Sequence, residues 1–176
     1  MKTSSSGIDF IANHEGLRLV AYQDIAGYWT IGYGHKIVPG EDYLFGAPIT
    51  QVQAKELLAG DLATAENAVN SDIYVDLEQN QFDALVSLVF NIGAGAFGGS
   101  TVRKRINDKD TEESIREAWL RWDKVTINGE LTSSRGLARR RQDETDLFYT
   151  GLKKKIMWIL GAVIVAVILV VVYRWM

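Results

Sequence analysis

The alternation of apolar and polar residues over the first fifty positions predicts a small β-rich segment. Residues 19–22 and 28–33 carry the aromatic and β-branched side chains typical of strands, and residues 23–27 between them have the composition of a turn. Residues 36–48 contain both prolines of the chain and two glycines, so they are predicted to form a loop. A hairpin followed by a loop is therefore expected near the N-terminus.

Apolar residues at helical spacing predict that most of the chain from about residue 50 to residue 151 is helical. Residues typical of helix N-termini precede the predicted helices, and these are Ser6, Thr50, Asp76, Ser100, Thr111 and Ser134. The helix after Thr50 is long enough to bridge two lobes, and the helix that ends at Gly93 is apolar on more than one face, which predicts a central position. Residues 93–99 lack the Lys-Ser/Thr ending of a phosphate loop and are predicted to form a tight turn. The dipeptide Asn128-Gly129 predicts a second hairpin.

These elements indicate the α+β class, with a small N-terminal hairpin lobe, a larger helical lobe and a cleft between them. Charge also divides the chain, because residues 1–99 hold four Lys/Arg against twelve Asp/Glu, whereas residues 100–152 hold eleven against ten. An acidic domain argues against nucleic acid as a partner. The chain has no cysteine, which excludes disulfides and thiol catalysis.

The C-terminal residues differ from the rest of the chain. Residues 156–173 contain no charge and are mostly Val, Ile, Leu and Ala, at the lower end of the length that crosses a bilayer. The flanking basic and aromatic residues are Lys153, Lys154, Lys155, Trp158, Tyr173 and Trp175. The pattern predicts a lipid-spanning segment, so we expect a domain at 1–152 and an anchor at 153–176. Residues 1–10 lack the apolar stretch of a secretory signal.

Three polar residues around the first hairpin carry the candidate chemistry. Glu15 lies just after the first predicted helix, Asp24 follows nine residues later in the turn, and Thr30 lies six further on in the returning strand. Two carboxylates across a cleft suit hydrolysis of a sugar linkage, in which one donates a proton and the other activates water. Each residue alone also fits an ordinary structural role, as a solvated helix end, a turn aspartate and a strand threonine.

The context of these residues is more specific. The string Glu-Gly-Leu-Arg-Leu, followed by Tyr-x-Asp and Gly-Tyr-x-Thr-Ile-Gly-x-Gly-His, resembles the active-site hairpin of phage-type lysozymes (glycoside hydrolase family 24). Residues 90–93 and 134–141 resemble later segments of that family, so the resemblance covers about residues 5–151. It implies an endolysin, a muramidase that hydrolyses the β-1,4 bond between N-acetylmuramic acid and N-acetylglucosamine with inversion. Glu15 would be the acid, and Asp24 with Thr30 would position water.

The resemblance also implies substrate contacts at Lys36, Phe90 and Ser100. Lys36 departs from the apolar residue of the T-even enzyme, and Phe90 equally fits the core. Arg135 is a further candidate and could contact a peptide or carboxylate of the glycan. It equally fits a solvated charge at the start of a helix. No metal or cofactor is implied.

Neither histidine has acids or cysteines at the spacing of metal ligands, and His35 is expected to make structural hydrogen bonds. Residues 139–141, followed by acids at i+4, are predicted to form a paired, solvated helix face.

Two other functions remain open. A lytic transglycosylase would use a single acid/base and give anhydro-sugar products, and a lysozyme fold can also act as a non-catalytic cell-wall-binding or membrane-remodelling protein. The presence of Asp24 and Thr30 beside Glu15 argues against both.

The basic residues before the tail predict that the domain lies on the cytoplasmic side of the host inner membrane, away from the peptidoglycan. It would then wait for a separate membrane-opening lysis protein, reside in a virion membrane, or release its tail from the bilayer. The last is least attractive, because apolar side chains leave lipid at high cost.

Overall fold

The computed structural model describes residues 1–24, 26–127 and 129–151. Its helices are α1 (Ser5–His14), α2 (Gln51–Asp61), α3 (Ala63–Asp72), α4 (Gln79–Ile92), α5 (Ala94–Gly98), α6 (Thr101–Asn107), α7 (Glu112–Leu120), a 3₁₀ turn η1 (Asp42–Phe45) and a final helix over 135–151. Its strands are β1 (Arg18–Gln23), β2 (Trp29–Gly32), β3 (His35–Lys36), β4 (Lys124–Ile127) and β5 (Glu130–Ser133). The predicted α+β class is confirmed.

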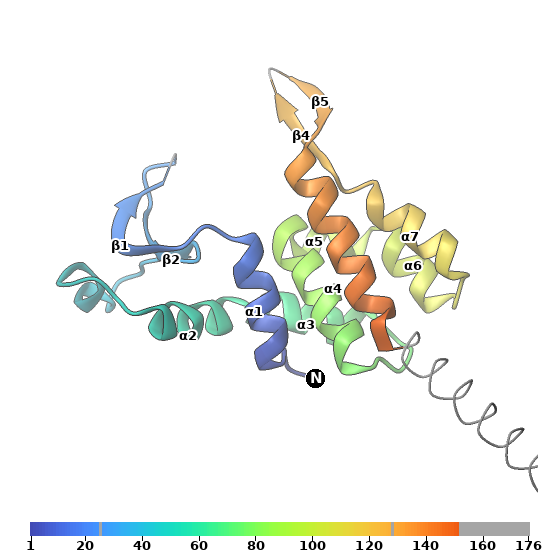
Figure 1. The fold of residues 1–176 in the computed structure, drawn as a ribbon, viewed down its shortest axis with the longest axis horizontal. Coiled ribbons are helices and arrows are strands. Elements are labelled where there is room, and N and C mark those ends of the chain that lie inside the picture. The colour runs from blue at the N-terminus through green and yellow to red at the C-terminus, as the bar shows by residue number, and fades with distance from the viewer. Residues whose placement is uncertain (25, 128, 152–176) are drawn as a thin grey trace, which may run out of the picture.

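A small antiparallel sheet in the order β1-β2-β3 forms the N-terminal lobe, on the left of Figure 1. Thr30 on β2 pairs with Tyr22 on β1 and with Lys36 on β3, so the three side chains leave the same face of the sheet. The predicted hairpin is therefore present. The loop predicted at 36–48 needs correction at its start, because Lys36 belongs to β3, and the rest of it contains η1.

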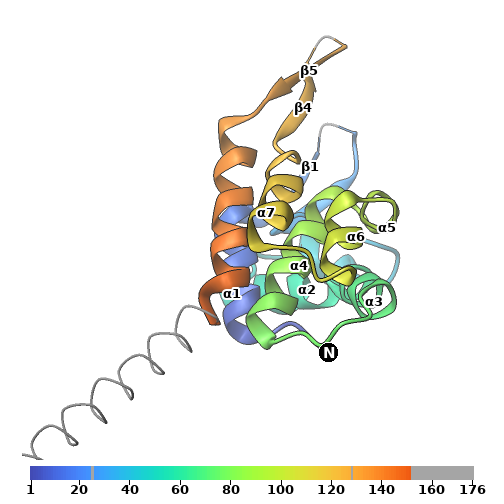
Figure 2. The same ribbon diagram turned by 90° about the vertical axis from the view of Figure 1, so that its right-hand side faces the viewer.

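Helix α4 lies at the centre of the helical lobe, between α1, α3 and the final helix (Figures 1 and 2). Its side chains are buried from Phe82 to Val89, as expected for a helix with more than one apolar face. Gly93 ends α4 with a φ of 88°, a backbone conformation that favours glycine. The predicted central helix is confirmed, together with its end.

Four local predictions need correction. The N-cap of α1 is Ser4 rather than Ser6, because the Ser4 hydroxyl accepts the Gly7 N–H and also donates to Asp83 on α4. The capping box of α4 begins at Glu78 rather than Asp76. Residues 93–99 contain α5 instead of a simple tight turn. The long bridging helix is divided at Leu62 into α2 and α3, although the capping box at its start is present as predicted.

The second hairpin is present, since β4 and β5 pair with Ile127 opposite Glu130. It projects from the helical lobe at the top of Figure 1. The final helix is capped by Ser134, whose hydroxyl accepts the Leu137 N–H, and it remains helical at Gly151, where an end was predicted. Over the described residues, no helix is both long and apolar enough to cross a bilayer. The predicted lipid-spanning segment at 156–173 lies outside these residues.

Candidate active site

Glu15 is the C-cap residue of α1, where the chain turns from the helix into the sheet. Its backbone is extended, with φ −105° and ψ 150°, and its N–H still donates to the Ala12 carbonyl at 3.2 Å. The next residue is Gly16, and β1 begins at Arg18. The carboxylate therefore projects from the end of a helix whose first turn is fixed to α4 through Ser4 and Asp83.

A buried arginine of the final helix holds this carboxylate. Arg140 donates from Nη1 to Glu15 Oε1 at 2.7 Å, and its side chain is 5% exposed against 25% for Glu15. Arg140 also donates from Nε to Glu144 Oε1 at 3.1 Å. Glu144 is fully buried and accepts hydrogen bonds from Ser87 Oγ at 2.7 Å and from Trp119 Nε1 at 2.9 Å. This network connects the candidate acid to the centre of the helical lobe.

The prediction of a paired, solvated face at residues 139–141 is thus wrong in part. Arg139 does lie opposite Asp143 at 3.8 Å and is exposed. Arg140 and Arg141 are buried and turn inward, and Arg141 donates to Asn91 Oδ1 at 3.0 Å and to Glu144 Oε1 at 3.0 Å. The i,i+4 spacing of Arg140 and Glu144 was the available signal, but spacing does not show which face is covered.

Asp24 organises the turn of the first hairpin through one oxygen. Its Oδ1 accepts the backbone N–H groups of Ala26 and Tyr28, each at 2.9 Å. The Asp24 N–H donates to the Tyr28 carbonyl, and the Gly27 N–H donates to the Asp24 carbonyl, both at 2.9 Å. The side chain is therefore oriented by its own turn. Among the described residues, no hydrogen bond involves the second oxygen, Oδ2.

Thr30 is buried in β2, with 3% of the residue exposed. Its hydroxyl donates to the Tyr28 carbonyl at 3.1 Å, which leaves the oxygen able to accept a hydrogen bond. The same carbonyl accepts from Asp24 N–H, so a single backbone group fixes both candidate water-positioning residues. The sequence spacing alone does not reveal this shared carbonyl.

A cavity of about 650 Å³ lies beside Glu15, between α1, the end of α4 and the final helix. It is lined by Phe10, Asn13, His14, Glu15, Asn91, Ser134, Gly136, Leu137, Arg139, Arg140 and Asp143. Burial lowers the pKa of His14, and the neighbouring Arg140 charge lowers it further against the opposing effect of Asp143. The cavity therefore combines apolar walls with charged groups near the candidate acid.

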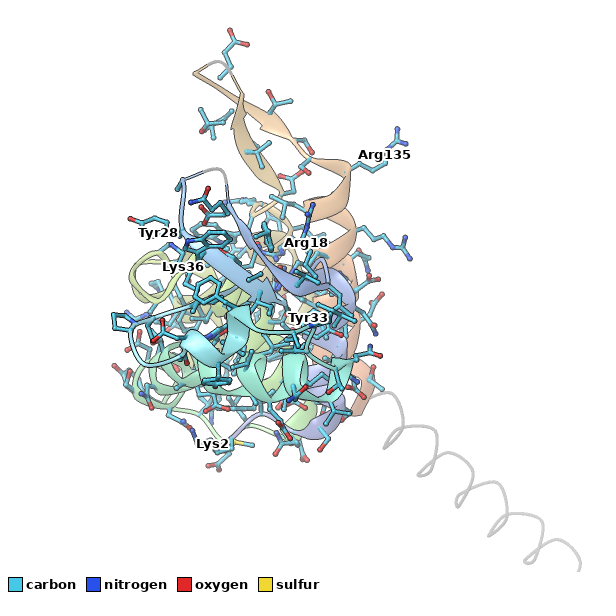
Figure 3. The ribbon with its side chains drawn as sticks, turned by 90° about the vertical axis from the view of Figure 1, so that its left-hand side faces the viewer. Lys2, Arg18, Tyr28, Tyr33, Lys36 and Arg135 are labelled. Carbon is cyan, nitrogen blue, oxygen red and sulfur yellow. The ribbon has the colours of Figure 1, made fainter. Side chains whose placement is uncertain are left out.

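The other candidate substrate residues occupy different environments. Phe90 is partly buried against the core, and Ser100 is buried, where its hydroxyl caps α6 by accepting the Arg103 N–H at 3.1 Å. Lys36 is exposed on β3, and Arg135 is exposed at the start of the final helix (Figure 3). Of these four residues, Lys36 and Arg135 are therefore the ones that are exposed to solvent.

His35 makes the structural hydrogen bonds predicted for it. Its Nδ1 lies 2.9 Å from Asp61 Oδ1 on α2, and its Nε2 lies 3.0 Å from Glu41 Oε2. Burial lowers the pKa of His35, but the hydrogen bonds to the two carboxylates outweigh it, and the net shift is upward. In the part of the chain that the structure describes, no group of three or more His, Asp or Glu residues could hold a metal ion.

Comparison with known proteins gives consistent matches. The family model described as phage lysozyme matches residues 12–144. An endolysin of Acyrthosiphon pisum secondary endosymbiont phage 1 is 45% identical over 84% of this chain and 98% of its own length.

Among solved structures, the endolysin from Escherichia coli O157:H7 phage FAHEc1 is 42% identical with a TM-score of 0.75, over 84% of this chain and 93% of the other. The muramidase domain of SpmX from Asticaccaulis excentricus is 41% identical with a TM-score of 0.74, over 84% and 97%. The chain therefore belongs to the phage lysozyme family.

Proposed function

We propose that Glu15, Asp24 and Thr30 carry out the reaction of this lysozyme, the hydrolysis of the β-1,4 bond between N-acetylmuramic acid and N-acetylglucosamine in peptidoglycan. The observation that carries this proposal is the different anchoring of the two carboxylates. Glu15 is held by a buried arginine at a helix end, whereas Asp24 is held by backbone N–H groups in a solvated turn. Different environments are what separate the roles of two carboxyl groups in such a reaction.

In this proposal Glu15 donates its proton to the leaving glycosidic oxygen. Arg140 engages Oε1, so Oε2 is the oxygen that carries the proton and faces the substrate. As the proton leaves, negative charge develops on a carboxylate already within hydrogen-bond distance of a guanidinium. A donor fixed before the reaction stabilises developing charge without reorganisation during it.

Asp24 and Thr30 position the attacking water. Oδ1 of Asp24 is occupied by the turn, so Oδ2 accepts one hydrogen of the water and draws off its proton. Thr30 Oγ1 donates to a carbonyl and accepts the other hydrogen of the same water. Attack on the face opposite Glu15 inverts the anomeric carbon, which requires carboxyl groups roughly 6.5–9.5 Å apart.

The reaction is tested by mass analysis of fragments released from purified peptidoglycan. Fragments with reducing ends, absent with the Glu15→Gln variant, are expected for the proposed hydrolysis. Anhydro-ended fragments would instead assign the chain to the lytic transglycosylases and make Asp24 incidental. Release of no fragments by the wild-type chain, with retention on peptidoglycan, would indicate a cell-wall-binding role.

Among the substrate residues, Lys36 and Arg135 are the candidates for contacts with the polymer. Both are exposed, whereas the Ser100 hydroxyl is engaged as a helix cap and Phe90 packs on the core. In this proposal Ser100 and Phe90 support the fold around the site instead of recognising substituents.

We also propose that residues 156–173 anchor the lysozyme domain, residues 1–152, in the host inner membrane. The support is the uncharged apolar run behind three lysines. The full-length chain is expected to stay in the membrane pellet after an alkaline carbonate wash, and a chain ending at residue 152 is expected in the supernatant. Replacing both Ile164 and Val165 by lysine should release the full-length chain from the membrane, since each central lysine costs about 3 kcal/mol on insertion. A soluble full-length chain would contradict the anchor.

We further propose, from the basic flank, that the domain lies on the cytoplasmic side before lysis. Access to peptidoglycan would then depend on a separate membrane-opening lysis protein. In spheroplasts with an intact membrane, external protease should leave the domain undigested. Digestion of the domain would overturn this orientation.

A further inference from the structure

The N-terminal half of the chain has few cations, and the structure separates them into two groups. Residues 1–99 contain Lys2, Arg18, Lys36 and Lys55 as their only Lys or Arg. Lys2 pairs with Glu66 and Lys55 pairs with Asp9, each at 2.6 Å. Among the described residues, neither Arg18 nor Lys36 forms an ion pair, although residues 1–99 contain twelve Asp/Glu.

These two cations lie instead over tyrosine rings. The Arg18 guanidinium carbon is 4.6 Å from the centroid of the Tyr22 ring, and the Lys36 ammonium is 4.1 Å from the centroid of the Tyr28 ring. A cation over an aromatic face is held in place while it keeps its full charge and remains accessible to an anion. In Figure 3, Tyr28 and Lys36 lie next to one another on the β lobe, and Arg18 lies on the same lobe.

Strand register places both pairs around Thr30. Tyr22 on β1 and Lys36 on β3 are the cross-strand partners of Thr30 on β2. Side chains paired in this way share one face of the sheet, so Thr30 is flanked by Tyr22 on one side and by Lys36 on the other. Arg18 lies opposite Gly32, beyond a β-bulge, and reaches this face through its contact with the Tyr22 ring. The positive charges therefore bracket the proposed water-positioning residue.

We propose that Arg18 and Lys36 bind carboxylate groups on the peptide stems of peptidoglycan and so favour peptide-bearing glycan over uncharged glycan. This inference rests on the proposed function. N-acetylated sugars of the glycan backbone carry no charge, whereas each peptide stem carries free carboxylates next to the bond to be cleaved. Arg18 and Lys36, as unpaired cations, complement the negative charge of these carboxylates. Their attraction also offsets the repulsion between the polymer and the acidic residues of the domain.

The test compares native sacculi with sacculi whose carboxylates have been converted to amides, using the full-length chain in mild detergent. The wild-type chain is expected to lose about tenfold in kcat/KM on the neutralised sacculi, as for two solvent-exposed charge contacts. The Arg18→Gln/Lys36→Gln variant should cleave both substrates at similar rates, because it lacks the groups that distinguish them. The Arg18→Lys variant keeps the charge and should keep most of the discrimination. Lys104→Gln removes one positive charge from an ion pair on α6, away from the β lobe, and should discriminate as the wild type does.

Binding is measured separately in the Glu15→Gln background, where the sacculi stay intact. Removing both cations should weaken retention on native sacculi about tenfold and leave retention on neutralised sacculi at the level of the parent variant. Equal wild-type activity on both substrates, or wild-type discrimination in the double variant, would overturn the inference. If the wild-type chain releases fragments from neither substrate, it is the proposed hydrolysis that fails.

Discussion

Arg140 and Glu15 are 125 residues apart in the sequence and form a hydrogen bond of 2.7 Å between Nη1 and Oε1. The arginine is in turn bonded to a fully buried glutamate that also accepts from Ser87 and Trp119. Such a chain of charge-assisted hydrogen bonds leaves Glu15 little rotational freedom. Arg140 is therefore a positioning residue for the proposed acid.

Replacing Arg140 by methionine is expected to lower both stability and turnover. The buried Glu144 loses a cationic partner, which should reduce the free energy of unfolding by about 3 kcal/mol. Because Glu15 is no longer oriented, kcat should fall at least about tenfold while KM changes little. Urea denaturation and steady-state kinetics check the two effects. Arg140→Lys should recover part of kcat, and a KM effect with intact kcat would contradict the positioning role.

Arg139 provides the matched control on the same helix. Its side chain is 85% exposed and lies 3.8 Å from Asp143. Arg139→Met removes an equal charge from a solvated pair, so the free energy of unfolding should change by less than about 0.5 kcal/mol.

Replacing Glu15 by glutamine should abolish lysis without unfolding the protein. The amide keeps the shape of the side chain but cannot donate a proton, and a general acid contributes roughly 10²–10⁴-fold to rate. Turbidity loss of peptidoglycan suspensions and thermal unfolding give the two readouts. Glu113→Gln, at an exposed position of α7, should retain wild-type lysis. Near wild-type lysis by Glu15→Gln would remove this residue from the mechanism.

Asp24 allows its turn-forming role to be separated from its chemical role. Asp24→Asn keeps an Oδ1 that accepts from Ala26 and Tyr28 but loses the charge on the other atom. We expect at least about a hundredfold fall in kcat and a nearly unchanged melting temperature. Asp24→Ala should show the same fall together with lower stability, because the turn loses its acceptor. Full activity of Asp24→Asn would reduce Asp24 to a turn residue.

The pKa of His35 sets a pH dependence of stability. Burial lowers this pKa, but the hydrogen bonds to Glu41 and Asp61 outweigh it and raise it above 6.5. A raised pKa in the folded state stabilises the fold fully below the unfolded pKa, and this stabilisation is lost as pH rises through the folded pKa. Hydrogen bonds to charged groups suggest a contribution of about 2 kcal/mol.

The test compares the free energy of unfolding of the wild-type and His35→Gln chains at pH 5.5 and pH 9. The difference should be largest at pH 5.5, where the imidazole is protonated. Glu41 remains ionised there, because its hydrogen bonds from the Val38 N–H and His35 lower its pKa. An equal difference at the two pH values would exclude the ionic contribution.

Local patterns in the sequence predicted the elements but not their contacts. The hairpin at Asp24, the capping box at Thr50 and the end of α4 at Gly93 depend on residues close in sequence, and all three are present. The prediction of Ser6 as the N-cap of α1 is wrong, because the Ser4 hydroxyl caps the helix by accepting the Gly7 N–H. That hydroxyl is held in place by Asp83 on α4, which is distant in the sequence. A contact between residues so far apart in the sequence produces no local pattern from which it could be predicted.

The candidate site shows the same division. The spacing of Glu15, Asp24 and Thr30 was visible in the sequence, whereas the arginine that holds Glu15 was assigned to a solvated face. A run of arginines interleaved with acids looks alike whether it faces water or a buried glutamate, because both arrangements use the same i,i+4 spacing. Only the packing of the final helix on α4 decides between them.

Because Glu15 and Arg140 are far apart in the sequence, the ribosome synthesises them at different times. Residues 15–30 leave the ribosome early and contain every proposed reacting group, but the guanidinium that orients the acid is made more than a hundred residues later. A nascent or truncated chain that lacks the final helix therefore carries the reacting groups without the support that aligns them. The hydrogen bond that orients the proposed acid can form only in a chain that extends to the final helix.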